Sequence, residues 1–412
     1  MPAPDDFEAW FRLLQTPGVG RESARRLLAA CGSPEAVLRA SPATWRALAG
    51  AAVAQALAQV PPQFDARLAA ARAWLDGADD RHVLTPGHPA YPPRLLQTAD
   101  PPLLLYVQGR LSTLSAPGVA VVGSRGATAQ GLDNARQFAA ALAERGYVVV
   151  SGLAAGIDGA AHEGALGTLA SPGAAADLEA PDANADLPGV TLAFIGTGPD
   201  IVYPASHRAL AARIAARGAI VSEYAPGTPP LPENFPPRNR LIAGLSLGTL
   251  VVEAALRSGS LITARLAAEA GREVFAIPGS IHAPQSRGCH ALIRQGAKLV
   301  ETAEDIVEEL RQHGTTAAGF TATSTATTSS TSTPATAPAA GAHRESTAPI
   351  DDSPAAADPL LQAMGHDPVT LDALLARTGF GVAQINARLL ELELEGRLAR
   401  LPGGLFQRRS AG

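Results

Sequence analysis

Small polar and charged residues recur directly after short apolar runs in the middle of the chain, and their types suit binding of an anion. One group is Gly123, Ser124 and Arg125; the others are Ser151 and Gly152, then Phe235 with Arg238, Asn239 and Arg240, and finally Ser258, Ser260 and Thr263. Glycine lets backbone N–H groups approach a ligand, serine donates short hydrogen bonds, and arginine pairs with phosphate through two parallel bonds. These groups predict a phosphate-binding site.

The spacing excludes the common nucleotide and catalytic motifs. The first glycine turn reads Gly-Ser-Arg-Gly-Ala-Thr-Ala-Gln-Gly over 123–131, which does not match the dinucleotide pattern, and no Gly-x-x-x-x-Gly-Lys is present. Ser151, Asp158 and His162 invite a hydrolase triad, yet Ser151 lacks the Gly-x-Ser-x-Gly elbow. His282, Cys289 and neighbouring histidines show no metal-ligand spacing. We expect no cofactor, no metal and no enzyme activity.

Alternating strands and helices must position these residues. Continuous apolar runs lie at 119–122, 147–150, 192–195, 219–221, 250–252 and 274–277, with helical segments at 130–145, 206–217, 238–246, 260–270 and 288–295. Apolar strands with helical crossovers predict an α/β fold, a Rossmann-like, doubly wound, mostly parallel sheet covered on both faces. Ligands of such sheets bind beyond the carboxyl ends of the strands, so the polar groups should converge there.

Four regions follow from composition and periodicity. Residues 1–82 form a helical domain of the SAM or helix-hairpin-helix type, whose Pro-Gly-x-Gly turn at 17–20 precedes Arg21, Arg25 and Arg26. Residues 83–311 form the Rossmann-like domain that carries the predicted phosphate site, and 312–357, rich in Thr, Ala, Ser and Pro, read as a disordered linker. A polar insert at 171–189 reads as a mobile loop. Residues 358–412 predict a winged helix.

The overall charge leaves a local nucleic-acid site open. Thirty-three basic against 38 acidic residues give a net charge of -5, which excludes only a histone-like polycation. The winged-helix region carries six arginines and six acids, so a protein-interaction role competes with duplex binding there. No apolar run is long enough for a membrane span, and two distant cysteines exclude a disulfide framework, so we expect a cytoplasmic protein with no membrane contact.

The middle region resembles the DNA-processing protein A (DprA/Smf) family. The resemblance rests on runs that recur in order: Val-Val-Gly-Ser-Arg at 121–125, Ser-Gly-Leu-Ala-Ala-Gly-Ile-Asp at 151–158 with Ala-His at 161–162, Tyr-Pro at 203–204, Ser-Glu-Tyr at 222–224, Phe-Pro-Pro-Arg-Asn-Arg at 235–240, Val-Glu at 252–253, Ser-Gly-Ser at 258–260 with Ile-Thr-Ala at 262–264, and Pro-Gly at 278–279. The flanking helical and winged-helix regions also match that family's extended architecture.

The resemblance implies a protein that binds single-stranded DNA without cutting it, protects incoming strands in natural transformation and helps load RecA recombinase. Arg125 is then prominent in the DNA groove, and Phe235 offers a stacking face. The family often has a basic residue after Tyr-Pro, where this chain has Ala205; His207 and Arg208 lie nearby. The family works as a homodimer, and the implied contacts form a short list: His290, Ile293 and Leu299.

Two alternative functions, from other classes of protein, remain open on the basis of the sequence. One is a nucleoside-monophosphate phosphoribohydrolase-like enzyme, which the chain resembles at Gly248-Thr249 followed by Glu253, although 244–248 read Gly-Leu-Ser-Leu-Gly and leave that loop incomplete. The other is a winged-helix transcription regulator with an effector-binding Rossmann domain.

Overall fold

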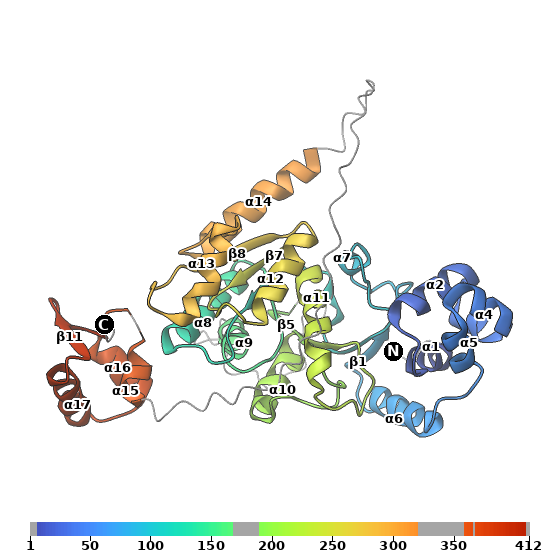
Figure 1. The fold of residues 1–412 in the computed structure, drawn as a ribbon, viewed down its shortest axis with the longest axis horizontal. Coiled ribbons are helices and arrows are strands. Elements are labelled where there is room, and N and C mark those ends of the chain that lie inside the picture. Colours follow the sequence, from blue (N-terminus) through green and yellow to red (C-terminus); the bar gives the residue numbers. More distant parts are fainter. Residues whose placement is uncertain (1–5, 168–188, 320–357, 366, 409–412) are drawn as a thin grey trace. The chain divides into compact units, whose positions relative to one another are not determined.

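The computed structural model describes residues 6–167, 189–319, 358–365 and 367–408 (Figure 1). Its chain divides into two compact units, residues 1–307 and 308–411. The mobile insert predicted at 171–189 lies outside the described residues except for Gly189, as does most of the predicted linker. Helix α14 (Ala303–Gly319) runs past residue 312, the position at which the linker was predicted to start.

A nine-stranded sheet forms the centre of the first unit. Its strand order is β1-β2-β6-β5-β4-β3-β7-β8-β9, and it is parallel except for β1 and β2 at one edge. The strands are β1 (Arg81–Leu84), β2 (Leu105–Gly109), β3 (Gly118–Val122), β4 (Val148–Ser151), β5 (Thr191–Ile195), β6 (Ala219–Ser222), β7 (Gly248–Val251), β8 (Glu273–Ala276) and β9 (Lys298–Leu299). Strands β3 to β7 are buried throughout because their runs are apolar on both faces. The predicted mostly parallel sheet is confirmed.

Helices cover both faces of this sheet (Figure 1). They are α7 (Pro93–Leu96), α8 (Ala129–Glu144), α9 (Ile157–Gly167), α10 (Arg208–Arg217), α11 (Phe235–Leu245), α12 (Ser260–Glu269) and α13 (Arg287–Arg294), with 3-10 turns at Leu111–Leu114, Ala205–His207, Pro232–Asn234 and Pro284–Ser286. Right-handed crossovers place α8, α9 and α10 on one face and α11, α12 and α13 on the other. The direction of winding reverses between β3 and β7, and a doubly wound sheet binds ligands at that switch point.

Six helices precede the sheet and share a core with its antiparallel edge. They are α1 (Phe7–Gln15), α2 (Arg21–Cys31), α3 (Pro34–Arg39), α4 (Pro42–Ala49), α5 (Ala51–Leu57) and α6 (Phe64–Asp76). Serines cap α3 and α4, each followed by proline at the first helical position. Phe11 and Trp74 from this region join Tyr106 of β2 in one apolar cluster.

The second unit has the predicted winged-helix composition. It contains α15 (Pro359–Met364), β10 (Val369–Thr370), α16 (Leu371–Thr378), α17 (Val382–Leu394), β11 (Leu398–Leu401) and β12 (Leu405–Arg408). The strands form a sheet of order β10-β12-β11, and Thr370 caps α16 by accepting a bond from the backbone of Ala373. Its core gathers Leu374, Ile385 and Phe406.

Among the helices that the structure describes, none combines the length and the apolar character that a membrane crossing requires.

Candidate nucleic-acid interface

A cleft of about 680 Å³ opens at the switch point, beyond the carboxyl ends of β3 and β7. Nine of the residues selected from the sequence line it, from three segments distant in the chain: Gly123, Ser124, Arg125, Phe235, Arg238, Asn239, Ser258, Ser260 and Thr263. The expectation that strand ends bring these groups together therefore holds for the loop after β3, the start of α11 and the start of α12.

The N-terminus of α12 faces this cleft, and the neutral hydroxyl of Ser258 accepts from the backbone N–H of Ser260 there at 3.4 Å. Ser258, Gly259 and Ser260 all line the cleft, and Gly259, the N-cap residue, makes no capping bond through a side chain. The Ser258 and Ser260 hydroxyls lie 2.7 Å apart. Backbone N–H groups and the positive end of the helix dipole attract an anion at such a terminus. This end of α12 is thus a place where a phosphate group fits.

The N-terminus of α8, in contrast, is filled by a carboxylate of the protein itself. Glu253 accepts bonds from the backbone N–H of Thr128 at 2.9 Å and from its hydroxyl at 2.5 Å. The backbone oxygen of Glu253 also accepts from Ser124, which fixes the loop that carries Arg125. A Cβ at Gly131, in the first turn of α8, would overlap this carboxylate. A phosphate cannot take that position while Glu253 holds it.

Two aromatic rings and an arginine form one wall of the cleft. The rings of Tyr203 and Phe235 lie 5.8 Å apart at 45°, and the Arg125 guanidinium lies over the Phe235 ring at 5.4 Å. Tyr203 is 46% exposed, and Arg125 is also exposed. Arg125 is therefore a solvent-accessible cation that rests on the face of an aromatic ring.

Arg238 forms the buried floor of the cleft. It is 3% exposed and donates to the backbone oxygen of Phe194 at 2.7 Å. Its guanidinium occupies the space where a side chain at Gly152 would stand. Burial lowers the pKa of Arg238 to about 10, which leaves it charged at neutral pH. Burial raises the pKa of the nearby Asp158, whose carboxylate accepts from the Gly152 backbone at 3.1 Å.

The same set of domains recurs in proteins of known sequence. A family model described as "DNA recombination-mediator protein A" matches residues 82–311, a DprA-like N-terminal HHH domain matches 4–62, and a DprA winged helix domain matches 344–404. Protein Smf of Escherichia coli (strain K12) is 40% identical over 347 residues, which cover 82% of this chain and 80% of the relative. The chain belongs to the DprA/Smf family.

A second relative and a solved structure agree with this assignment. DNA processing protein DprA of Streptococcus pneumoniae is 46% identical over 219 residues, 53% of this chain and 71% of that protein. The X-ray structure of DprA from the same species has a TM-score of 0.60 at 35% identity and covers 75% of this chain and 99% of that one. The predicted family and its three-part architecture are thus confirmed.

Five residues selected from the sequence do not line the cleft of this DprA/Smf family member. They are Ser151, Gly152, His207, Arg208 and Arg240. Ser151 is buried, and its hydroxyl donates to the Val121 backbone at 2.7 Å. The His207 ring nitrogen lies 3.0 Å from the Leu153 backbone oxygen. Arg208 lines a separate pocket beside α10.

Arg240 is held by carboxylates instead of facing a ligand. It contacts Glu223 at 2.6 Å and Asp100 at 2.9 Å and is 13% exposed. Asp100 also binds Arg21 and Arg25 of α2. Burial favours a higher pKa for Asp100, but Arg240 and the two α2 arginines outweigh it and hold that pKa below its usual range. Arg21 and Arg25, which follow the Pro-Gly-x-Gly turn, therefore join α2 to the carboxylate that also holds Arg240.

The hydrolase triad suggested by Ser151, Asp158 and His162 does not form in this family member. Each side chain bonds elsewhere: Ser151 and Asp158 as described above, and His162 to the Thr191 hydroxyl at 2.7 Å. Thr191 donates to the Val149 backbone, so the His162 Nδ1–H is the donor in that pair. Burial, with His207 and Arg238 adding to it, lowers the pKa of His162 to about 3. This histidine is a neutral packing group.

The further residues that line the cleft, not predicted as site residues from the sequence, include Tyr203 and Arg257. Tyr203 lies within the family-like Tyr-Pro run, and that run was the available signal. Arg257 lines the cleft from the loop before α12 and is exposed. Its position directly before Ser258-Gly259-Ser260 carries no motif that would single it out. Arg257 adds a third guanidinium to those of Arg125 and Arg238.

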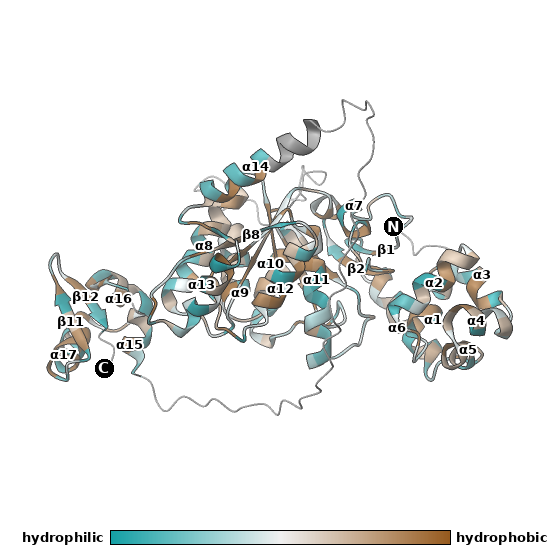
Figure 2. Ribbon diagram, turned by 45° about the horizontal axis from the view of Figure 1, so that its top comes forward, coloured by the Kyte–Doolittle hydropathy of each residue, from teal (hydrophilic) through white to brown (hydrophobic). Residues whose placement is uncertain are grey.

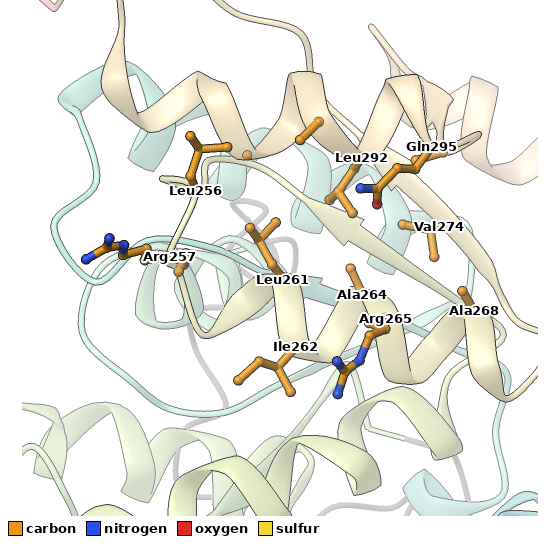
Figure 3. A pocket seen from close by; sticks show the side chains of 14 residues that line it. Leu256, Arg257, Leu261, Ile262, Ala264, Arg265, Ala268, Val274, Leu292 and Gln295 are labelled. Atoms are coloured by element: carbon orange, nitrogen blue, oxygen red, sulfur yellow. The ribbon is translucent and has the colours of Figure 1, made fainter. Parts of the chain in front are cut away.

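The residues expected at a dimer contact lie on α13 and β9. Leu299 is 46% exposed on β9, the edge strand of the sheet, whereas Ile293 packs partly against the core. The His290 ring nitrogen lies 3.0 Å from the Gly279 backbone oxygen. A second pocket of about 600 Å³ lies between α12 and α13, with Leu261 and Leu292 pointing into it (Figure 3).

Proposed function

We propose that this DprA/Smf family member binds single-stranded DNA in the switch-point cleft and holds it without chemical change. One observation carries the proposal: the start of α12, with the Ser258 and Ser260 hydroxyls, shares a cleft with three arginines and two neighbouring aromatic rings. Among the described residues that line the cleft, the only carboxylate is that of Asp158, which is 7% exposed and bonded to the backbone. The cleft therefore offers an anionic strand cations and donors but almost no exposed negative charge.

The same groups explain why such binding would accept any sequence. Phosphate contacts supply affinity with no information about the base, and stacking on an aromatic ring is worth about 1–3 kcal/mol per base for every base. In the proposed complex a base takes the place of Arg125 on the Phe235 ring, and Arg125 turns to the adjoining phosphate. Stacking needs a free base face, so single strands bind more tightly than duplex.

The wider role follows from the family and is part of the proposal. A recombination mediator that holds strands intact would protect incoming DNA during natural transformation and deliver it to RecA recombinase. We propose that it works as a homodimer through the edge around β9 and α13, with His290, Ile293 and Leu299 at the contact. The exposure of Leu299 on an unpaired sheet edge supports this choice.

Fluorescence anisotropy with labelled oligo-dT and a duplex of equal length tests the DNA site. We expect tighter binding of the single strand by the wild type. Arg125→Ala should weaken it about tenfold, by about 1.4 kcal/mol, and make the log-log salt dependence shallower by about 0.7 for each phosphate that the variant no longer neutralises. Arg213→Ala, an exposed arginine of α10 outside the cleft, is the matched control. Equal weakening in both variants, or weakening limited to certain sequences, would contradict the proposed site.

A further inference from the structure

Helix α17 of the winged-helix unit carries apolar side chains on two opposite faces. Ile385, Leu389 and Leu392 are buried in the core of the unit. A second stripe is accessible to solvent: Ala383, Ala387, Leu390 and Leu394. Leu390 is 57% exposed and Leu394 is 81% exposed. We call these four residues the outer stripe. At 3.6 residues per turn its members fall on one narrow face of the helix.

The spacing of the outer stripe is that of a helix-pairing seam. Its residues follow one another at intervals of four, three and four, which is the a/d repeat by which two helices pack side by side. Figure 2 shows that α17 carries apolar residues although it lies at the margin of its unit. Nothing else in the described part of this unit covers the stripe, since its core cluster holds only the opposite face of α17. An exposed seam of this kind points to a helical partner.

The charges beside the outer stripe argue against a nucleic acid as that partner. Glu391 and Glu393 flank the stripe on its two sides, and both are exposed. The arginine of the helix, Arg388, is engaged by Asp358 at 2.7 Å and by Glu391. Phosphates approaching this face would meet carboxylates and leucines and would find no unpaired cation on the helix.

We propose that the outer stripe pairs with the α17 stripe of a second copy of this chain, in antiparallel orientation. The stripe is symmetric about its midpoint: with Ala383 opposite Leu394 of the other copy, Ala387 lies opposite Leu390. Small residues thus face large ones throughout, which suits close packing in a two-fold interface. The order of the four residues determines this register.

The flanking polar residues fit the same register. In it, Gln384 lies on the same flank of the interface as Glu391 of the other copy and is its neighbour there, and Asn386 is likewise the neighbour of Glu393 on the opposite flank. Each carboxylate meets an amide that donates a hydrogen bond, and no two carboxylates face each other. The interface is smaller than the roughly 1,200 Å² of standard protein complexes, so it is weak by itself and acts when two chains are already held close.

Disulfide cross-linking of the full-length chain tests the pairing and its direction. Ala383→Cys and Leu394→Cys are made separately in a Cys31→Ser background; the remaining Cys289 is buried. The antiparallel register brings residue 383 of one copy to residue 394 of the other. Two copies of residue 383 would lie about 16 Å apart along the helices, beyond disulfide reach. We expect a cross-linked dimer in the mixture of both variants and none in either variant alone.

A third substitution and a longer reagent make the result decisive. Leu390→Glu, added to both proteins, should abolish the cross-link, with an unchanged circular dichroism spectrum as evidence of folding. A short bis-maleimide reagent repeats the experiment without strict disulfide geometry. Cross-linking of Ala383→Cys with itself would show parallel pairing and overturn the register. Absence of any 383–394 product with both reagents would overturn the proposal of a second copy as the partner.

Discussion

Helices α8 and α12 both start at the rim of the central sheet, yet their N-termini differ. A carboxylate of the protein occupies the N-terminus of α8, whereas the N-terminus of α12 opens into the cleft. At α8, Thr128 caps the helix and Glu253 supplies a carboxylate to the backbone of the cap residue. At α12, only the neutral hydroxyl of Ser258 is seen to bond the backbone of the first turn among the described residues, no carboxylate does, and the first residues of the helix line the cleft. Both ends present the same kind of backbone donors and the same dipole. The difference shows that a nearby side chain decides whether a helix N-terminus is a structural joint or a binding site.

Other polar groups around the sheet extend this contrast. On the side of α8 and α9, polar groups such as Glu253 and His162 are bonded within the protein. At the cleft, in contrast, Arg125 from the loop after β3 and Asn239 and Ser260 from α11 and α12 line an open space. We call the groups bonded within the protein the closed side and the groups that line the cleft the open side. Substitutions on the closed side should therefore change the stability of the fold, and substitutions on the open side should change the affinity for single-stranded DNA.

The largest effect is expected from adding one methyl group at the closed N-terminus. Gly131→Ala places a Cβ into the Glu253 carboxylate, and we expect it to lower the free energy of unfolding by about 3 kcal/mol. Gly259→Ala at the open N-terminus is the control, because its Cβ meets nothing within 4 Å. Chemical denaturation of both variants measures the difference. Equal free energies of unfolding for the two variants would show that the Glu253 carboxylate does not pack tightly against the N-terminus of α8.

A pH series provides the next test of the closed side. The pKa of His162 is about 3 in the folded chain against an ordinary 6.5, so the unfolded chain binds the extra proton first as the pH falls. This contribution to stability is complete above pH 6.5 and decreases as the pH falls towards 3, and the decrease amounts to about 2 kcal/mol at pH 5. His162→Gln should flatten this part of the profile in denaturation experiments. The affinity of the variant for oligo-dT at pH 7 should stay at the wild-type value, and a fall would contradict the division of roles.

A carboxylate placed at the open end should convert it to the closed type. Ser258→Asp is expected to reduce affinity for single strands about tenfold or more, by about 1.4 kcal/mol, because the charge occupies the phosphate position. Ser258→Asn is the neutral control of similar shape. Anisotropy titrations compare the two. If the aspartate variant binds as well as the asparagine variant, the start of α12 does not contact phosphate.

Much of the fold was predictable because buried parallel strands are continuous apolar runs. Val119 to Val122 and Leu192 to Ile195 are runs of this kind. Strands β1 and β2 were not predicted: β1 begins with Arg81 and His82, and its antiparallel pairing with β2 has no short turn to mark it. The two-residue β9 is too short for any periodic signal.

A residue of the candidate site was predictable when its position at the end of a strand determines where it lies. It was not predictable when a partner distant in the sequence determines what its side chain contacts. Gly123 to Arg125 reach the cleft because they follow β3. Arg238 and Arg240 stand two apart on one helix, so they point to different sides. Only the structure shows that Asp100 and Glu223 hold the second of them. The role of Glu253 at α8 likewise depends on a partner 125 residues away in sequence.

Hydrogen exchange with and without saturating oligo-dT tests the central contrast most directly. The account predicts slower exchange of backbone amides at 123–126 and 258–263 in the complex, with no change at 128–133, where Glu253 already holds the start of the helix. Protection of 128–133 without protection of 258–263 would contradict it, because the strand would then occupy the N-terminus that the structure assigns to the protein's own carboxylate.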